Sequence, residues 1–522
     1  MADAVRRNIV DGGANPDGRT LNTAAIQRAI DEVHHSGGGM VYAPPGIFLI
    51  GGLELKSGVT LYLEAGCTLL GSPSIQDYEF HPGPPRHADA TGCHVLFAQD
   101  ADDVSICGTG TIDGQGPAYW EPTVGRAPTK PEDAWMEGAT GWYRVRNNNR
   151  RPSPMIEFAG CRNVHVRDIT LKNSSGWTLR PIACDTVVID AIRIRNPVFG
   201  PNTDGLDITA CRNVFVSSCD IITGDDAICL KSENPYGELL PTKNVTITNC
   251  VLTTSCNGFK MGTATHGAFQ NILFSNSVIY SDADSPLNTR PSAGICVEMV
   301  DGGSVDGVLV SNIRMENVRA PIFVRLGERR RKQGTFLRNV LIEGVDATGA
   351  IVSSSITGVP GLRPTDITVS NSRIRTVEQG EVAWRHRTIP EEADKYPEAR
   401  MMGRLPSFGF YIRHADRVRL RDVECLTDLP DGRPAIVCDD VVDLILSGLE
   451  LSAPTGDAPA IDLRNTRRAL LTGMRPPPAR SAFVEVSGSG SSEVVLRGIS
   501  GAPGPALVRF GEGAPTDSAR WD

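Results

Sequence analysis

Short runs of alternating apolar and polar residues recur along most of this chain, and each follows a polar turn. The repeated phrase is a Cys, Asn or Asp turn followed by V-x-V or V-x-I, as in CRNVHVRDITLKN, CRNVFVSSCDIIT and TKNVTITNCVLTT. Its first apolar residue recurs at spacings of 23, 27, 31 and 27, at Val164, Val187, Val214, Val245 and Ile272. Alternation combined with a repeat of ~20–50 residues is typical of stacked β-strands and not of helices.

A β-sandwich is the alternative for alternating strands, but its strands would not repeat one turn phrase a dozen times. The repeat therefore predicts an all-β solenoid, in which the frequent Asn and Gly residues suit tight bends. Asn22–His35 is instead an amphipathic helix, with Asn22 or Thr23 as N-cap and Gly37–Gly39 as its end. A helix there would cover the open strand edges at the end of the solenoid.

One β-helical domain is expected over residues 1–522, with the N-terminal cap and first coils at 1–70, central coils at 71–452 and terminal coils at 453–522. Long loops on a regular scaffold usually carry function. Trp120, Trp135 and Trp142 lie in one such loop and either stack on sugar rings or anchor their own loop. The segments that interrupt the repeat are Tyr78–Thr91, Pro117–Pro152, Ser281–Ser292 and Glu378–Ser407.

Composition limits the partners. The formal net charge is −9, and no basic face dominates, so neither a nucleic acid nor an anionic membrane surface is an expected partner. The N-terminus has no apolar signal-peptide core, which predicts an intracellular protein or one whose leader has been removed. Many of the 13 cysteines lie in apolar runs without zinc-type spacing, so we expect no zinc site and no cofactor.

Three carboxylates lie at a spacing that matches one coil of the solenoid. Asp204 stands in an Asn-Thr-Asp-Gly run, and the adjacent Asp225 and Asp226 stand in TGDDAICLKS. Their separation of 21 residues (225 − 204) brings all three to one face of stacked coils. Crowded carboxylates let one stay protonated as an acid while another activates water, as glycoside hydrolysis requires. Backbone capping and a calcium site are the alternatives.

The helix, the repeat and the run NTDGLD…TGDDAICLKS together resemble glycoside hydrolase family 28, the polygalacturonase-like pectinases. The resemblance covers about residues 10–317 well and the later coils more loosely. It implies an inverting mechanism without a metal, in which Asp225 is the general acid and Asp204 and Asp226 hold and activate the water. Asn202, in the same run as Asp204, is a candidate substrate-binding residue.

Two stretches depart from the family's pattern. Where the family has a Gly-His-Gly or Ser-His-Gly turn, this chain reads SCNGFKMGT, with Asn257 in place of the histidine. His266, nine residues later, is either its substitute or a turn histidine bonded to the backbone. Where the family's Arg-Ile-Lys triplet grips a galacturonate carboxylate, this chain reads AGICVEM, with Cys296 and Glu298 in place of the cations. Plain homogalacturonan fits such a subsite poorly, and Glu298 is a candidate acceptor for neutral sugar hydroxyls.

Four other cations are candidate substrate-binding residues. Lys231 and Lys260 lie in otherwise apolar strands on neighbouring coils, and Arg325 and Arg413 lie in later strands. An unpaired ammonium in an apolar strand is costly, so each lysine must face a cleft or a carboxylate such as Glu298 or the aspartates. A cleft role is favoured over a purely structural ion pair.

The sequence therefore predicts a right-handed parallel β-helix that acts as an inverting glycoside hydrolase. Its expected partner is an α-linked pectic or related oligosaccharide or polysaccharide containing uronic acid or rhamnose residues, cut from an end because projecting loops would close one side of the groove. A β-helix lyase or transglycosylating enzyme is the second class, for which the missing histidine leaves room. A non-catalytic carbohydrate-binding β-helix is the third, and it gives no reason for clustering three aspartates. The oligomeric state is not indicated.

Overall fold

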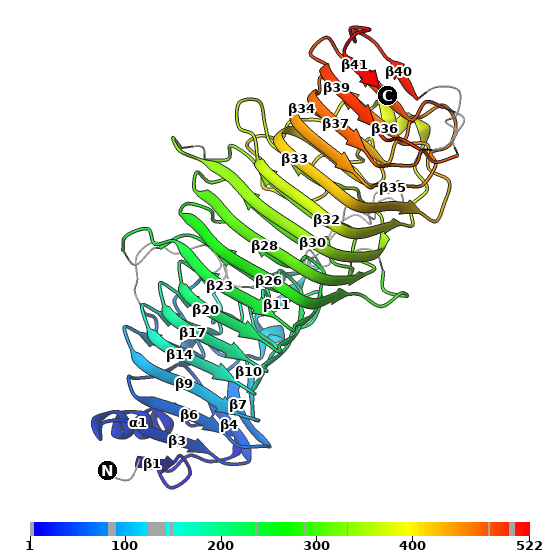
Figure 1. Ribbon diagram of the computed structural model, residues 1–522. Helices are drawn as coiled ribbons and strands as arrows, with labels where there is room; N and C mark the ends of the chain where they lie inside the picture. The colour runs from blue at the N-terminus through cyan, green and yellow to red at the C-terminus, as the bar shows by residue number, and fades with distance from the viewer. Residues whose placement is uncertain are drawn as a thin grey trace. The chain divides into compact units, whose positions relative to one another are not determined.

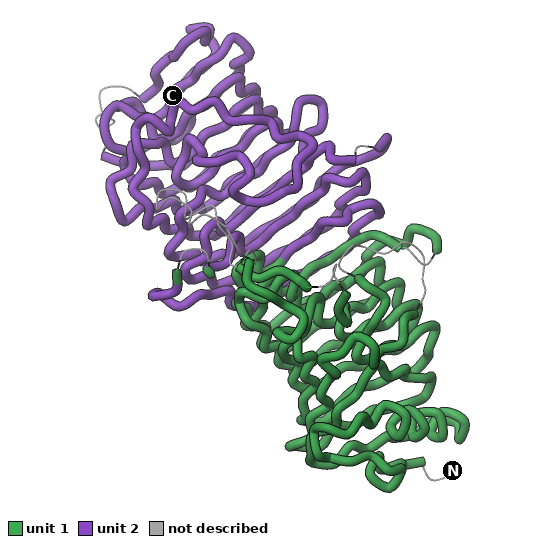
Figure 2. Tube along the Cα trace, turned by 180° about the vertical axis from the view of Figure 1, so that it is seen from behind, with its two compact units in different colours: residues 1–259, 286–289 green, residues 260–285, 290–522 purple. Residues whose placement is uncertain are grey.

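The computed structural model describes residues 5–81, 90–123, 142–146, 150–234, 237–286, 289–330, 332–478, 481–500 and 507–522. The chain forms two compact units (Figure 2). Unit 1 is Met1–Phe259 with Pro286–Thr289, and unit 2 is Lys260–Ser285 with Arg290–Asp522. No helix among the described residues has the length and apolar character needed to cross a membrane.

Unit 1 is a parallel β-helix whose strands stack in three columns (Figure 1). Stack A contains β5 (Leu53–Glu54), β8 (Leu96–Gln99), β13 (Ile156–Ala159), β16 (Leu179–Ile182), β19 (Leu206–Thr209) and β22 (Ile228–Lys231). Stack B contains β1 (Val5–Asn8), β3 (Gly39–Ala43), β6 (Val59–Leu63), β9 (Asp102–Gly108), β14 (Arg162–Arg167), β17 (Asp185–Asp190), β20 (Arg212–Ser217) and β23 (Thr242–Thr248). Stack C contains β2 (Asp17–Leu21), β4 (Gly46–Ile50), β7 (Cys67–Gly71), β10 (Thr111–Asp113), β15 (Thr170–Lys172), β18 (Arg193–Arg195), β21 (Asp220–Thr223) and β24 (Val251–Thr254).

The repeated valines are in register, which confirms the coil spacing predicted from the sequence. Val164, Val187, Val214 and Val245 lie opposite one another in β14, β17, β20 and β23. All four are buried in the interior of the helix, while their strand neighbours point outward. Apolar burial of one face per strand, repeated in every coil, therefore holds the stack together.

Asparagines mark the turn that leads from stack A into stack B. Asn163, Asn213 and Asn244 adopt left-handed φ values of 53°, 57° and 55°, a conformation that asparagine tolerates better than most residues. The Asn244 side-chain amide donates to Asn213 Oδ1 at 3.0 Å, and that of Asn213 donates to Asp185 Oδ1 at 2.8 Å. The predicted role of asparagine in the turns is thus confirmed.

Helix α1 (Thr23–His35) covers the first strands of unit 1, as predicted. Its buried face packs on β1, β3 and β5 and consists of Ala25, Ile26, Ala29, Ile30 and Val33. Asn22 is the N-cap residue, but its side chain accepts a hydrogen bond from the Asn15 amide at 2.7 Å and does not cap the helix. The helix ends at Ser36, directly before Gly37–Gly39.

Trp120 lies in β11 (Trp120–Pro122), which pairs antiparallel with β12 (Tyr143–Val145) after the short 3-10 helix η2 (Gly116–Tyr119). Its side chain is buried, and its indole N–H donates to the Ser175 carbonyl at 2.9 Å. Trp120 therefore anchors its own loop. Trp142 is exposed, and Trp135 lies outside the described residues. A further 3-10 helix, η1, spans Ile75–Asp77.

Unit 2 is also a parallel β-helix, but several of its strands run through two faces without a break. One series contains β26 (Ala268–Tyr280), β28 (Ser304–Glu316), β30 (Phe336–Ala350), β32 (Thr365–Thr376), β33 (Phe410–Thr427), β34 (Ile436–Ser447), β37 (Arg467–Thr472), β39 (Ser492–Arg497) and β41 (Ala519–Trp521), with the short β35 (Glu450–Leu451) beside β33. The other face contains β27 (Ala293–Met299), β29 (Ala320–Leu326), β31 (Ser354–Thr357), the first residues of β33 and β34, β36 (Ile461–Arg464), β38 (Val484–Ser487) and β40 (Val508–Phe510). The predicted loop Glu378–Ser407 lies between β32 and β33 and contains only the 3-10 helix η7 (Val382–His386). That the two units form one domain stays a prediction.

Candidate active site

Asp204, Asp226 and Asn257 occupy one position on three successive coils of unit 1. The Thr178 amide donates to the Asp204 carbonyl at 2.9 Å, that of Gly205 to Asp226 at 2.9 Å, and that of Ala227 to Asn257 at 2.8 Å. Asp204 and Asp226 each lie two residues before a strand, β19 and β22, and Asn257 begins β25 (Asn257–Met261). The one-coil spacing read from the sequence therefore places these side chains together at the leading edge of stack A.

Glycine and threonine shape the turn that carries the aspartate pair. The Gly224 amide donates to Thr203 Oγ1 at 3.0 Å, and that hydroxyl donates to the Gly200 carbonyl at 3.0 Å. A Cβ atom on Gly224 would lie 2.5 Å from the Gly200 carbonyl oxygen, so no larger residue fits there. The Asn-Thr-Asp-Gly and Thr-Gly-Asp-Asp runs are thus bound to each other through their turns.

Asp225 and Asp226 have different surroundings although they are adjacent. Asp225 is half-buried, and its Oδ1 accepts a 2.9 Å hydrogen bond from the Asp226 amide. Asp226 is buried, and its Oδ1 accepts a 2.7 Å hydrogen bond from the Asn257 side-chain amide. Asp225 is therefore the more accessible carboxyl of the pair, while Asp226 is held in one orientation.

Asp204 is the carboxyl most strongly affected by its environment. It is only 4% exposed, and its Oδ1 has no hydrogen-bond partner within the described part of the chain. Burial, followed by the charges of Asp207 and Asp225, raises its pKa well above the usual value, although Lys231 opposes the shift. Burial and crowding thus oppose the ionisation of all three carboxyls at once, and a retained proton is what acid-assisted bond cleavage needs.

Asp207, which the sequence analysis did not select, forms the main contact of Lys231. Lys231 Nζ lies 3.2 Å from Asp207 Oδ1 and donates to Cys229 Sγ at 3.1 Å, and both charged side chains are buried. Burial lowers the pKa of Lys231, but Cys229 and Asp207 outweigh it and raise the pKa well above the usual value. Lys231 therefore faces a carboxylate and stays charged. The one signal for Asp207 in the sequence is a carboxylate inside the apolar run Leu206–Thr209.

A buried ionic network continues from this pair across stack A. Arg180 lies 3.2 Å from Glu233 and 3.5 Å from Glu157, and its Nε donates to Thr209 Oγ1 at 3.4 Å. The Trp177 ring forms cation–π contacts with both cations. Arg180 Cζ lies 5.1 Å and Lys231 Nζ lies 4.9 Å from the ring centroid. The sequence analysis selected none of Arg180, Glu157 or Trp177.

Two further candidate residues, Asn202 in unit 1 and His266 in the turn after β25, have local contacts. Asn202 adopts a left-handed φ of 53°, and its Oδ1 accepts from Arg151 at 3.5 Å. His266 is half-buried and interacts electrostatically with Asp301, which Arg329 binds at 2.7 Å. Substrate-binding roles for Asn202 and His266 stay predictions.

Three predicted cations of unit 2 hold the loop Glu378–Ser407. Arg325 donates to the Glu391 carbonyl at 2.6 Å and to the Glu392 carbonyl at 3.2 Å, and Arg413 donates to the Ile389 carbonyl at 2.9 Å. Arg413 also forms an ion pair with the Glu391 carboxylate. Lys260 Nζ donates to the Tyr396 hydroxyl at 3.1 Å. Their visible role is to position this loop.

Glu298 and Cys296, which stand in place of the family's cations, are fully buried in β27. Glu298 lies opposite Arg325 in the parallel pairing of β27 with β29, and Cys296 lies opposite Phe323. The register thus places an acidic residue of β27 beside a basic residue of β29. A substrate-binding role for Glu298 stays a prediction.

Within the described residues, one group of three has side chains close enough for a metal ion. Single ligand atoms of Asp225, Asp226 and Cys256 lie within 4.8 Å of one another. Calcium takes oxygen ligands only, and structural zinc sites take four ligands rich in cysteine or histidine. Two carboxylates and one thiol match neither set.

Comparisons with known proteins agree with the family and the fold that the sequence predicts. The family model described as glycosyl hydrolases family 28 matches residues 54–382, more than half of the chain, and a model described as rhamnogalacturonase A/epimerase, pectate lyase-like, matches residues 6–74. A probable polygalacturonase of Vitis vinifera is 28% identical over 60% of this chain, and an exo-poly-alpha-D-galacturonosidase of Dickeya chrysanthemi is 26% identical over 60%. The chain spans 61% and 55% of the length of these two relatives.

Two solved structures show a similar fold. An exopolygalacturonase from Yersinia enterocolitica matches with a TM-score of 0.63 and 21% identity, covering 86% of this chain and 79% of that one. A hyperthermoactive exopolygalacturonase from Thermotoga maritima matches with a TM-score of 0.60 and 20% identity, covering 82% of this chain and 92% of that one. The predicted right-handed parallel β-helix is confirmed.

Proposed function

Because the chain belongs to family 28 of the glycosyl hydrolases, we propose that it cleaves an α-linked glycosidic bond of a pectic oligosaccharide or polysaccharide with inversion. The observation that carries the proposal is the common position of Asp204 and Asp226 on successive coils, with Asp225 beside them. A set of crowded carboxyls at one edge of a solenoid supports acid-assisted attack of water on a sugar.

Asp225 is the general acid in this proposal. It is the more accessible carboxyl of the adjacent pair, so it can reach the oxygen of the leaving sugar. Its proton passes to that oxygen as the glycosidic bond breaks. Asp204 and Asp226 hold the attacking water, and Asp226, whose ionised form the Asn257 amide favours, takes its proton as the new bond to the anomeric carbon forms.

Asn257 supports this division of roles. Its amide donates to Asp226 Oδ1 at 2.7 Å, which favours the ionised carboxylate and fixes its direction. The position that holds a histidine in the resembled family therefore holds here a group that cannot lose or gain a proton near neutral pH. Asn257 acts as a positioning residue in this proposal.

Polygalacturonan is the first substrate to test, because the relatives named above are polygalacturonases. Two features support a substrate with additional or different sugars, including rhamnose. Cys296 and Glu298 replace the family's cations, and the buried cations Lys231 and Arg180 are already paired with Asp207 and Glu233. A buried ion pair leaves little charge for a substrate carboxylate.

Attack from the end of a chain is supported by the relative from Dickeya chrysanthemi, an exo-poly-alpha-D-galacturonosidase. In unit 2, Arg325, Arg413 and Lys260 hold the loop Glu378–Ser407 through its carbonyls, Glu391 and Tyr396. Long loops on a regular scaffold usually carry function. In the alternative of β-elimination, Lys231 could act as the base only as a neutral amine, and it stays charged beside Asp207.

The test is incubation with polygalacturonan, rhamnose-containing and neutral oligosaccharides, with the anomeric form of new reducing ends followed by NMR. The proposal predicts β-anomeric products from an α-linked acidic substrate, released as short sugars from one end. Unsaturated products that absorb in the ultraviolet would show elimination and would overturn it, as would an initial α-anomer.

A further inference from the structure

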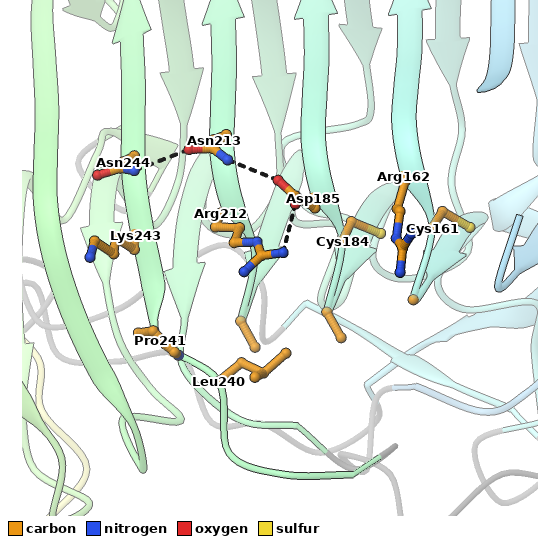
Figure 3. A pocket seen from close by; sticks show the side chains of 13 residues that line it. Cys161, Arg162, Cys184, Asp185, Arg212, Asn213, Leu240, Pro241, Lys243 and Asn244 are labelled. Atoms are coloured by element: carbon orange, nitrogen blue, oxygen red, sulfur yellow. Dashed lines mark hydrogen bonds and ion pairs between the residues drawn. The ribbon is translucent and has the colours of Figure 1, made fainter. Parts of the chain in front are cut away.

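A groove of about 610 Å³ lies on unit 1 where stack A turns into stack B (Figure 3). Its floor is formed by Gly160, Ala183 and Ala210, and Leu240 and Pro241 form an apolar border. The basic side chains of Arg162, Arg212 and Lys243 also line the groove, as do the amides of Asn213 and Asn244. The groove therefore combines basic side chains with an apolar border.

The basic residues occupy matching positions on stacked strands. Arg162 of β14 lies opposite Asp185 of β17, which lies opposite Arg212 of β20 and then Lys243 of β23. Successive strands are ~4.8 Å apart, so the row presents charges at regular intervals along the groove. Arg212 forms a 2.8 Å ion pair with Asp185. Arg162 and Lys243 form no ion pair with any of the described residues.

Some exposed arginines of unit 2 are arranged differently. Each of these is paired with a carboxylate on a neighbouring coil, as Arg338 is with Asp306, Arg417 with Asp366 and Arg468 with Asp443, at 2.6–2.8 Å. The groove keeps a net positive charge of two (three basic residues and one acidic residue) on a chain whose formal charge is −9. It is a local site of attraction for anions.

Two residues of the groove floor are alanines in a backbone conformation that alanine disfavours. Ala183 and Ala210 adopt left-handed φ values of 55° and 50°, where asparagine or glycine is favoured over alanine. The neighbouring turn row uses asparagine at Asn213 and Asn244 for the same conformation. Alanine at the floor leaves space for a ligand close to the backbone.

We propose that this groove is a second, non-catalytic binding site for an acidic oligosaccharide. Its carboxylates contact Arg162 and Lys243, the apolar face of a sugar ring packs on Leu240 and Pro241, and its hydroxyls meet the amides of Asn213 and Asn244. The choice of a uronate oligomer rests on the proposed function, whereas anion binding rests on the groove alone.

The groove is separate from the aspartates. Asp204 precedes β19 and Ala210 follows it, and six residues of extended chain span roughly 20 Å at ~3.3 Å per residue. A long acidic substrate that engages both places gains affinity through the raised effective concentration of its second contact. The site thereby favours long chains over short ones.

The experiment is hydrogen–deuterium exchange of the Asp225→Asn protein with a size-defined oligogalacturonate, a neutral galactan oligosaccharide or inorganic phosphate. We expect the oligogalacturonate alone to slow exchange in two places, around Ala183–Asp185 with Leu240–Asn244 and around Asp204 with Asp226. In R162Q/K243Q protein the concentration for half-maximal protection of the groove rises about tenfold or more, as expected when two charge-assisted contacts are lost. The matched control R167Q/R193Q removes two exposed arginines of the same unit and leaves it unchanged.

Protection at the aspartates without protection of the groove overturns this inference and leaves the proposed function standing. Protection of the groove alone keeps the inference and counts against the proposed function. Protection by phosphate alone, or by neutral galactan equally well, overturns the assignment to acidic oligosaccharides. A melting temperature equal to that of the parent protein confirms that R162Q/K243Q is folded. A Leu240→Ser variant tests the apolar border independently. The inference is also overturned if neither this variant nor R162Q/K243Q changes the oligogalacturonate concentration for half-maximal protection of the groove.

Discussion

The side-chain amide of Asn257 donates a 2.7 Å hydrogen bond to the carboxylate of Asp226, one coil away. Both side chains are buried, and their backbones are joined through the amide of Ala227 and the carbonyl of Asn257. The position of the Asp226 carboxylate is therefore fixed by the stacking of coils and by one neutral donor. This contact replaces the titrating histidine that the sequence pattern leads one to expect.

Asn257→Ala is predicted to lower kcat by about 10-fold to 100-fold with a smaller effect on KM. A hydrogen bond to a charged group contributes about 1.5–3 kcal/mol, and each 1.4 kcal/mol corresponds to a factor of ten in rate. Steady-state kinetics on the substrate found in the panel measures this. The control is Asn312→Ala, which removes an exposed amide that donates to Asn276 in unit 2. Equal kcat in the Asn257 and control variants contradicts the positioning role.

Lys231→Met is predicted to destabilise the protein by about 3–5 kcal/mol at neutral pH, because it leaves the buried Asp207 carboxylate without its cation. Urea unfolding measures the loss. The double variant K231M/D207N is expected to recover most of it, since both charges are then removed. Arg417→Gln, which breaks an exposed ion pair with Asp366, should cost less than about 1 kcal/mol. A loss of unfolding free energy in Lys231→Met as small as that in this control contradicts the account.

The pH dependence of stability should reveal the raised pKa of Asp204. Burial and neighbouring carboxylates raise its pKa in the folded protein, so the folded state binds more protons than the unfolded state between the two pKa values. Its contribution is therefore lost as pH rises from the unfolded value, near 3.9, toward the folded one. Relative to wild type, the free energy of unfolding of Asp204→Asn should rise by up to about 1.4 kcal/mol per pH unit as the pH rises above the unfolded value. A difference that does not change with pH rules out the raised pKa.

Arg413→Gln is predicted to release the loop Glu378–Ser407. It removes the donor to the Ile389 carbonyl and the ion pair with Glu391, so proteolysis within the loop should become about tenfold faster as local opening becomes easier. If the loop enforces attack from an end, the products should also include longer internal fragments. Arg417→Gln, on the same strand but paired with Asp366, is the control. Unchanged proteolysis and unchanged products in Arg413→Gln contradict this role.

The fold was largely predictable, because each coil repeats the same physical requirement. Val164 and Val187 had to be buried and in register, and the sequence spacing alone placed them opposite each other. The continuous strands of unit 2, such as β33, were not foreseen, since alternation along a strand does not show whether a bend interrupts it.

The site was predictable only in part. The coil spacing brought Asp204 and Asp226 together, as expected. Asp207 was missed because an outward-facing carboxylate on a strand normally meets water, and only the tertiary structure shows that it is buried. Arg325 and Arg413 were predicted for the substrate, but they contact a loop whose placement depends on long-range packing. Sequence spacing carries no information about such contacts.

The rate of Asp225→Asn tests the central claim most directly. The substituted amide is isosteric but cannot donate an acidic proton, so turnover of the pectic substrate should fall by about 10²–10⁴-fold while the melting temperature stays that of wild type. Asp168→Asn, which neutralises an exposed aspartate of the same unit, should keep the full rate. A folded Asp225→Asn protein with wild-type turnover would contradict the account.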